Sequence, residues 1–344
     1  MSEIIADFSQ SMREALPSGP PKEMLRVERD GLQTFVRINS SSLSLIQTCA
    51  RKSFYTLVEK WRARSGSPPL IYGQAMHKAM EVFYSHPARE RTIPKDFEEA
   101  APLMAHGHEA PEEHFLYEAV RAFVKEAEPL KALPDTDKRS IPSGIWVLGH
   151  YFKNYINDVY VVHSDEQGPM VERDFTFTFH EDSQLKIELF GRIDMVLRNE
   201  ATGQILPGDH KTSSQMGADF FNRIKPNHQY TGYLLGARKC LGVTDEHFLI
   251  NGIQSKARPL TSRGGPPTFT RQITRRSTED FMEFFDVVFW ATQSFLKWDA
   301  QNVWPLGTVD ACSSWGGCGF LDVCSAPNEL RSNILEAKFQ REKQ

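Results

Sequence analysis

Apolar and polar residues alternate strictly in part of this chain, which predicts strands with one buried face. Between Val171 and Phe179 the apolar positions are Val171, Phe175, Phe177 and Phe179, and the polar face carries Glu172, which is expected in solvent. Further strands are predicted at 34–38, 185–197, 206–212, 248–254 and 268–274. The segments from 171 to 212 therefore predict three meandering strands.

Elsewhere an apolar residue recurs every three or four positions, which predicts helices. These helices are expected from Ser40 to about 61, and at 72–84, about 112–130, 145–162, 227–241 and 278–298. Together with the strands they predict an α/β fold, with a mixed sheet inside a helical shell. We predict an N-terminal arm with one short strand at 1–39, a main domain at 40–325 with a helical insertion at about 87–142, and a charged C-terminal helix at 326–344.

Composition narrows the class of protein. The chain has 344 residues, 40% of them hydrophobic, which suits a globular protein of one large or two smaller domains. No run of about 18 apolar residues and no secretory signal pattern occurs, so we expect a cytoplasmic protein without a membrane span. The net charge of −4 argues mildly against nucleic acid as a partner, although a cleft needs only local positive charge.

Two aspartates and a lysine fall on consecutive predicted strands. Asp194 ends an apolar strand, and Asp209 and Lys211 lie two apart on the next, so their side chains emerge on one face while His210 points to the other. Carboxylates in this arrangement can hold Mg²⁺ or Mn²⁺ beside a phosphodiester, and a lysine can orient water or stabilise negative charge. The alternative is that each aspartate is a strand-end residue satisfied by hydrogen bonds.

Two predicted helices carry further polar candidates. His77 follows Gly73 by four residues, and Gln229 and Tyr233 share a helix face at i and i+4. Each of these residues could instead be an ordinary packed or surface residue.

Cysteines form the second group of candidates. Cys312, Cys318 and Cys324 lie within 13 residues, among glycines that let a loop wrap around a bulky centre. Cys49 would join them if the N-terminal helix closes onto the C-terminal segment. Such a set indicates a metal site in a reducing compartment rather than disulfides, and zinc and iron–sulfur centres both accept four thiolates.

In their order along the chain these pieces resemble the PD-(D/E)xK nuclease superfamily, and within it the RecB-like branch. The pieces span about 40 to 324 and comprise the Ser42–Phe54 helix, Gly73 to His77, Gly191 to Asp194, Asp209 to Lys211, Gln229 to Tyr233 and the tail cysteines. The resemblance implies a restriction-endonuclease-like core with a cysteine-cluster cap. Five residues separate Cys312 from Cys318, where the family pattern has two.

The resemblance also implies site roles and an activity. It implies a metal-dependent DNA exonuclease of recombination, repair or processing, with His77, Asp194, Asp209 and the backbone carbonyl of His210 as metal ligands and Lys211 as the catalytic lysine. Gln229 and Tyr233 would contact the DNA backbone or orient Lys211. A [4Fe–4S] cluster, with zinc as the alternative, would sit on Cys49, Cys312, Cys318 and Cys324.

The implied partner is single-stranded or end-containing DNA. The chain has no Walker A motif, so a helicase or recombination protein is a further expected partner. Two other classes stay open, namely a non-catalytic DNA-binding or assembly subunit with a nuclease fold and a zinc-stabilised interaction protein. Exonuclease or endonuclease action, cleavage polarity and oligomeric state also stay open.

Overall fold

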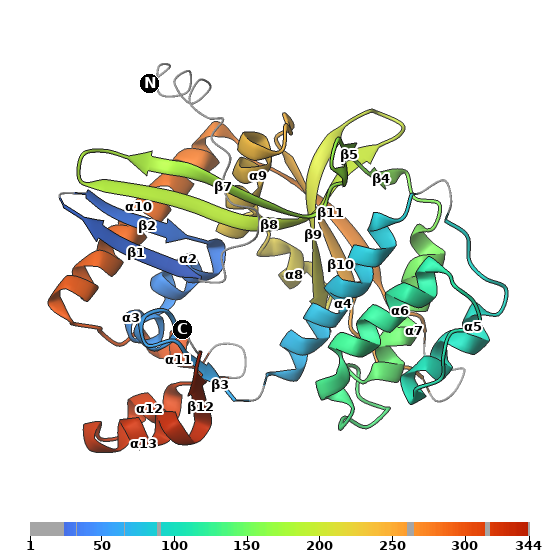
Figure 1. The fold of residues 1–344 in the computed structure, drawn as a ribbon, viewed down its shortest axis with the longest axis horizontal. Helices are drawn as coiled ribbons and strands as arrows, with labels where there is room; N and C mark the ends of the chain where they lie inside the picture. The colour runs from blue at the N-terminus through green and yellow to red at the C-terminus, as the bar shows by residue number, and fades with distance from the viewer. Residues whose placement is uncertain are drawn as a thin grey trace.

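An eight-stranded mixed sheet runs through the molecule, as Figure 1 shows. The structure is a computed structural model that describes residues 24–31, 33–64, 66–87, 91–259, 265–313 and 317–342. The strands are β1 (Leu25–Asp30), β2 (Gln33–Ile38), β4 (Tyr160–Val162), β7 (Val171–Glu181), β8 (Leu185–Asn199), β9 (Ile205–Ser213), β10 (His247–Gln254) and β11 (Phe269–Arg275). The predicted mixed α/β architecture is confirmed.

Strand β8 is the centre of this sheet. The main path runs β1-β2-β8-β9-β10-β11, while β7 and β4 also pair with β8. β2 with β8 and β9 with β10 are the parallel pairs; the remaining pairs are antiparallel. β8 is apolar on both faces, with Met195 and Leu197 in one core and Ile193 and Val196 in the other, because helices cover both sides.

One face of the sheet is covered by a helical lobe, drawn on the right in Figure 1. This lobe comprises α4 (Pro68–Ser85), α5 (Phe97–Ala100), η3 (Ala101–His106), α6 (Phe115–Glu126), η4 (Glu128–Leu130) and α7 (Ile141–Tyr155). The opposite core is closed by α2 (Ser40–Thr48), α9 (His228–Cys240) and α10 (Thr278–Gln301), and the short helix α8 (Ala218–Asn222) precedes α9. None of the described helices combines the length and apolar character needed to cross a bilayer.

The C-terminal segment packs against residues from the N-terminal part of the chain. It contains α11 (Val309–Ser313), α12 (Leu321–Ser325), α13 (Asn328–Lys338) and β12 (Phe339–Arg341), and it meets α3 (Ala50–Ser53), η1 (Phe54–Val58) and β3 (Trp61–Ala63). β12 pairs with β3, and Trp61 and Tyr55 share a small core with Phe320 and Phe339. The predicted charged helix is therefore one part of a cap that joins distant segments.

Several predicted boundaries are wrong. The helix expected at 145–162 ends at Tyr155, since Ile156 and Asn157 form a turn, Asp158 accepts a hydrogen bond from Tyr160 N–H, and Tyr160–Val162 form β4. The helix expected from Ser40 to about 61 is interrupted at Cys49, whose backbone is extended. Residues 25–30 of the expected arm form β1, and residues 1–23 lie outside the described part of the chain. The two-residue strands β5 (Ser164–Asp165) and β6 (Gly168–Pro169) form a small hairpin.

Candidate metal and phosphodiester site

Three possible metal ligands converge from three elements. His77 lies on α4, Glu172 on β7 and Asp194 on β8, and one ligand atom from each lies within 4.8 Å of the others. Nδ1 of His77 is 3.2 Å from Oδ2 of Asp194. An imidazole nitrogen and two carboxylates form a donor set that suits Mn²⁺ or Mg²⁺.

The backbone of β7 explains why Glu172 belongs to this group. Val171 pairs with Met195 and Arg173 with Ile193, so Glu172 lies opposite Asp194. Its φ of +51° is in the left-handed region. This turns the strand so that Val171 packs with the helical lobe whereas Phe175 packs in the other core. The prediction that Glu172 faces solvent was therefore wrong. The sequence signal that could have shown this is Arg173, a polar residue at a position where the alternation requires an apolar one.

Asp209 and Lys211 lie beside this group on β9. Lys211 Nζ is 2.7 Å from Oδ2 of Asp209 and donates a hydrogen bond of 3.0 Å to its Oδ1. The backbone N–H of His210 donates a hydrogen bond of 2.7 Å to Oδ2 of Asp194, which joins the two strands at the site. A Cβ at Gly208 would lie 2.9 Å from Cε of Met195, so glycine allows β9 its close approach to β8. The structure thus brings the expected His, Asp, Asp and Lys together.

The charges of His77 and Asp194 stabilise each other. Burial disfavours the charged form of both groups, but their attraction outweighs it. The pKa of His77 rises to about 9, and the pKa of Asp194 falls to about 2. In the absence of a metal ion, His77 is therefore protonated at neutral pH and forms an ion pair with Asp194.

Asp209 and Glu172 have raised pKa values, in contrast to Asp194. Burial, together with the neighbouring Asp194 carboxylate, raises the pKa of Asp209 to about 6 and that of Glu172 to about 7, although Lys211 lowers the pKa of Asp209. Three buried or half-buried carboxylates thus share one site with Lys211 and His77. Burying carboxylates without fully neutralising them costs free energy, and a bound divalent cation would reduce that cost. The residues present therefore fit a metal ion.

His210 points its ring away from the carboxylates, as expected. The ring is 3% exposed, its Nδ1 lies 2.7 Å from Nδ2 of Asn251, and it packs beside Tyr84. Burial lowers the pKa of His210 to about 3, so the ring stays neutral. Asn251 donates onward to Tyr151, which joins Tyr84 and Arg271 in a buried polar network. The ring of His210 therefore belongs to this network, and its centroid also lies 5.8 Å from that of the His77 ring.

Helix α9 lies beside Asp209 and Lys211. A Cβ at Gly191 would lie 3.1 Å from the Tyr233 ring, which puts Tyr233 directly against β8. Burial raises the pKa of Tyr233 to about 12, with a further contribution from Asp209, whereas a hydrogen bond with Gln229 lowers it. The Tyr230 ring centroid lies 5.9 Å from Lys211 Nζ. Tyr230 was not predicted, because its apolar helical spacing resembles that of a core residue.

The four candidate cysteines lie in the C-terminal cap and its contact with α3. Cys49 Sγ accepts backbone hydrogen bonds from Gly307 at 3.2 Å and Lys52 at 3.4 Å, and a Cβ at Gly307 would lie 3.0 Å from Cys49 Cβ. Cys318 N–H donates to the carbonyl of Cys312 at 2.8 Å. Burial raises the pKa of Cys324, and the charges of Cys318 and Cys49 raise it further, whereas Arg51 lowers it. The thiols of Cys49 and Cys318 are therefore close enough to Cys324 to influence its charge, but among the described residues no three cysteine sulfurs lie within 4.8 Å of one another.

A model of a known protein family matches most of the chain. Residues 37–325 match the family model described as the PD-(D/E)XK nuclease superfamily. Among solved structures, the chain is similar to a protein from Eubacterium rectale to which exonuclease activity is ascribed. That likeness has 13% sequence identity and a TM-score of 0.36, and it covers 80% of this chain and 85% of that one. None of the curated proteins matches the chain.

Proposed function

Because the chain belongs to the PD-(D/E)XK nuclease superfamily, we propose that it is a metal-dependent deoxyribonuclease acting at the site around Asp194 and Asp209. The observation that carries this proposal is the convergence of His77, Glu172 and Asp194 within 4.8 Å beside the Asp209–Lys211 pair. A non-catalytic relative would not require five ionisable groups in one partly buried site.

In this proposal, His77, Glu172, Asp194 and Asp209 supply the metal ligands, and the His210 carbonyl is a further candidate. A bound Mg²⁺ or Mn²⁺ would polarise the scissile phosphate and lower the pKa of an attacking water. His77 must release its proton before it can act as a ligand, since only neutral imidazole has a free lone pair.

Lys211 has a separate role. Burial alone would lower its pKa, but Asp209 and the surrounding groups raise it, so the ammonium keeps its charge. A protonated amine cannot ligate a metal, but it can stabilise the negative charge that develops on the phosphate oxygens. Tyr230, and Gln229 with Tyr233, stand on the adjacent helix face, where they can position Lys211 and the DNA backbone.

The narrower assignment is an exonuclease that acts on DNA ends in recombination, repair or processing. It rests on the motif order, which resembles the RecB-like branch. We also propose a four-cysteine centre, a [4Fe–4S] cluster with zinc as the alternative, on Cys49, Cys312, Cys318 and Cys324. The backbone N–H groups directed at Cys49 Sγ fit a bound thiolate, and the centre would hold the cap to α3. A helicase or recombination partner would supply any motor activity.

One assay tests the activity and the narrower assignment together. Purified protein is incubated with end-labelled linear DNA, single- and double-stranded, and with closed circular single-stranded DNA, in Mg²⁺, Mn²⁺ or EDTA. We expect metal-dependent loss of the linear DNA, with the circle resistant. Asp209→Asn and Lys211→Met should each lose activity by about 10²-fold or more. Cleavage of the circle would show endonuclease action, and wild-type activity in Asp209→Asn would overturn the site.

A further inference from the structure

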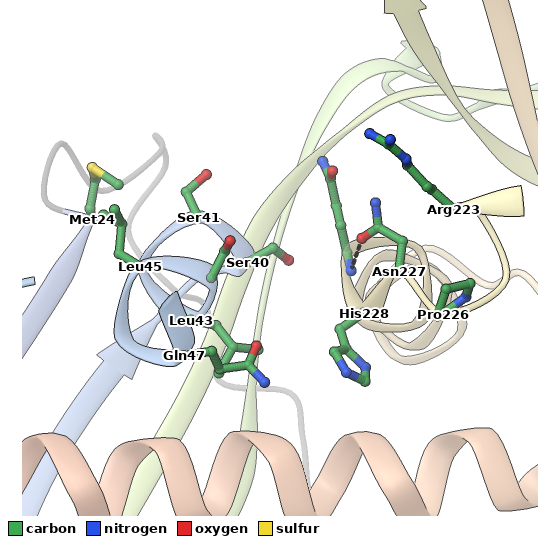
Figure 2. Close-up of a pocket in the computed structure, with 12 residues that line it drawn as sticks. Met24, Ser40, Ser41, Leu43, Leu45, Gln47, Arg223, Pro226, Asn227 and His228 are labelled. Atoms are coloured by element: carbon green, nitrogen blue, oxygen red, sulfur yellow. Dashed lines mark hydrogen bonds between the residues drawn. The ribbon is translucent and has the colours of Figure 1, made fainter. Parts of the chain in front are cut away.

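A groove of about 690 Å³ lies between helix α2 and the start of α9, and Figure 2 shows the side chains that line it. One wall comes from α2 and the other from the turn before α9 and its first residues. The lining residues are Met24, Ser40, Ser41, Leu43, Ser44, Leu45, Gln47, Arg223, Pro226, Asn227, His228 and Gln229. None of these lining residues is acidic, although the whole chain carries a net charge of −4.

The first residues of α2 and of α9 both line the groove. Helix geometry leaves the N–H groups of a first turn without intrahelical acceptors. Asn39 caps α2 by accepting from Ser42 N–H, and Asn227 caps α9 by accepting from Gln229 N–H, so each cap satisfies one of these donors. Serine hydroxyls, the Arg223 guanidinium and the His228 ring add donors along the same groove. This chemistry suits a chain of anions better than an apolar ligand.

The groove and the catalytic face share helix α9. Gln229 lines the groove, and one helical turn later Tyr233 lies against Gly191 on β8, three residues before Asp194. The groove wall is also held firmly. The buried Arg276 donates to the carbonyls of Ile224 at 3.0 Å and Asn227 at 3.4 Å. A ligand in this groove would therefore lie at a fixed position relative to the metal site.

We infer that this groove binds the phosphodiester backbone of a single DNA strand whose neighbouring phosphate lies in the metal site. The inference rests on the proposed nuclease function and adds a substrate-binding subsite to it. The volume falls in the range of about 300–1,000 Å³ that holds small ligands, so it admits a few nucleotides of one strand. Ser41, Arg223 and His228 would contact phosphates, and the strand would leave the catalytic centre along α2.

The test is the binding of a fluorescent single-stranded oligonucleotide to the full chain in Ca²⁺, measured by anisotropy at two salt concentrations. Ser41→Glu places a carboxylate at an exposed position on the groove wall. An acidic residue in the first turn favours helix formation, so this variant should fold as well as the wild type. We expect the Kd to rise at least fivefold, and Ser44→Lys to lower it and to steepen its salt dependence.

The matched control is Ser332→Glu, which makes the same change at an exposed serine of α13 outside the groove. Its Kd should equal that of the wild type. Equal losses in both glutamate variants, unchanged binding in Ser41→Glu, or tighter binding of duplex than of single strand would overturn the inference. Binding is measured without cleavage. If Ser41→Glu weakens binding in a protein that cleaves no DNA, the proposed function is refuted and the groove assignment stands.

Discussion

Glu172 and Asp194 face each other across the pairing of β7 and β8, with Glu172 held at a φ of +51°. The left-handed conformation of a glutamate costs free energy, on the order of 1–3 kcal/mol. The cost places a third carboxylate at the site, so the local backbone favours metal binding at the expense of stability.

Glu172→Gln should separate the contribution of this carboxylate to metal binding from the cost of burying its charge. The amide removes a charge from the metal site, so we expect the Kd for Mn²⁺ to rise about tenfold or more. The metal-free protein should gain stability at pH 8, by roughly 1 kcal/mol, since burial no longer opposes a negative charge there. Calorimetric titration and urea unfolding measure the two quantities. Glu181→Gln, at an exposed position of the same strand, is the control and should change neither.

Metal affinity should rise with pH. The folded-state pKa values of Asp209 and Glu172 are about 6 and about 7, above their ordinary values, and that of His77 is about 9. All three groups must lose a proton to bind metal, so we expect Ca²⁺ affinity to increase at least tenfold from pH 5.5 to pH 8. Calorimetric titration across this range measures it, and an affinity that is independent of pH would contradict the assignment of these ligands.

The same shifts set the stability of the metal-free protein. A carboxyl group whose pKa is raised on folding favours the folded state at low pH and loses that contribution as pH rises to 7. His77, with its raised pKa, contributes below pH 6.5 and loses the contribution as pH passes 9. The Tm without metal should therefore fall from pH 5 to pH 9, and added Ca²⁺ should raise it more at the alkaline end.

The cysteine centre is tested by elemental analysis of anaerobically purified protein. We expect iron and sulfide in the wild type, and loss of both, with a lower Tm, in Cys318→Ser. Cys240→Ser is the matched control, since Cys240 is exposed on α9 and belongs to no candidate ligand set. Stoichiometric zinc without iron would select the alternative metal, and a metal-free wild type would refute the centre altogether.

Arg276 is fully buried and donates from Nε to Thr231 at 2.8 Å and from Nη1 to Thr274 at 2.7 Å, besides the two carbonyls of the groove wall. Arg276→Met would leave these acceptors without donors, so we expect a loss of roughly 2–4 kcal/mol in the free energy of unfolding. Arg275→Met removes an exposed ion pair with Glu246 and should cost less than about 1 kcal/mol. Urea unfolding compares the two variants. Equal losses in the free energy of unfolding would show that the hydrogen bonds of Arg276 add no more stability than an exposed ion pair.

The chain order of apolar segments predicted the strands that carry Asp194, Asp209 and Lys211, because each is continuous and lies in the centre of the sheet. The segments that the pattern misjudged depend on distant partners. Residues 25–30 become a strand only by pairing with β2, and Trp61 lies in a strand only because Phe339 to Arg341 reach it. The position of Glu172 was predicted wrongly because one backbone angle, which a two-residue period does not reveal, changes the face of the sheet to which the following side chains point.

The pairing of β3 with β12 bears on how the chain is made. Trp61 emerges from the ribosome long before Arg341, its partner in the ladder, and at about 5–20 residues per second the delay is tens of seconds. During that time Tyr55 and Trp61 cannot be covered by Phe320 and Phe339. The helical lobe and the sheet can form while translation proceeds, but the cap closes only after Phe320 to Arg341 have been synthesised. Tyr55 and Trp61 of a nascent chain therefore stay accessible to chaperones until the residues that cover them have been made.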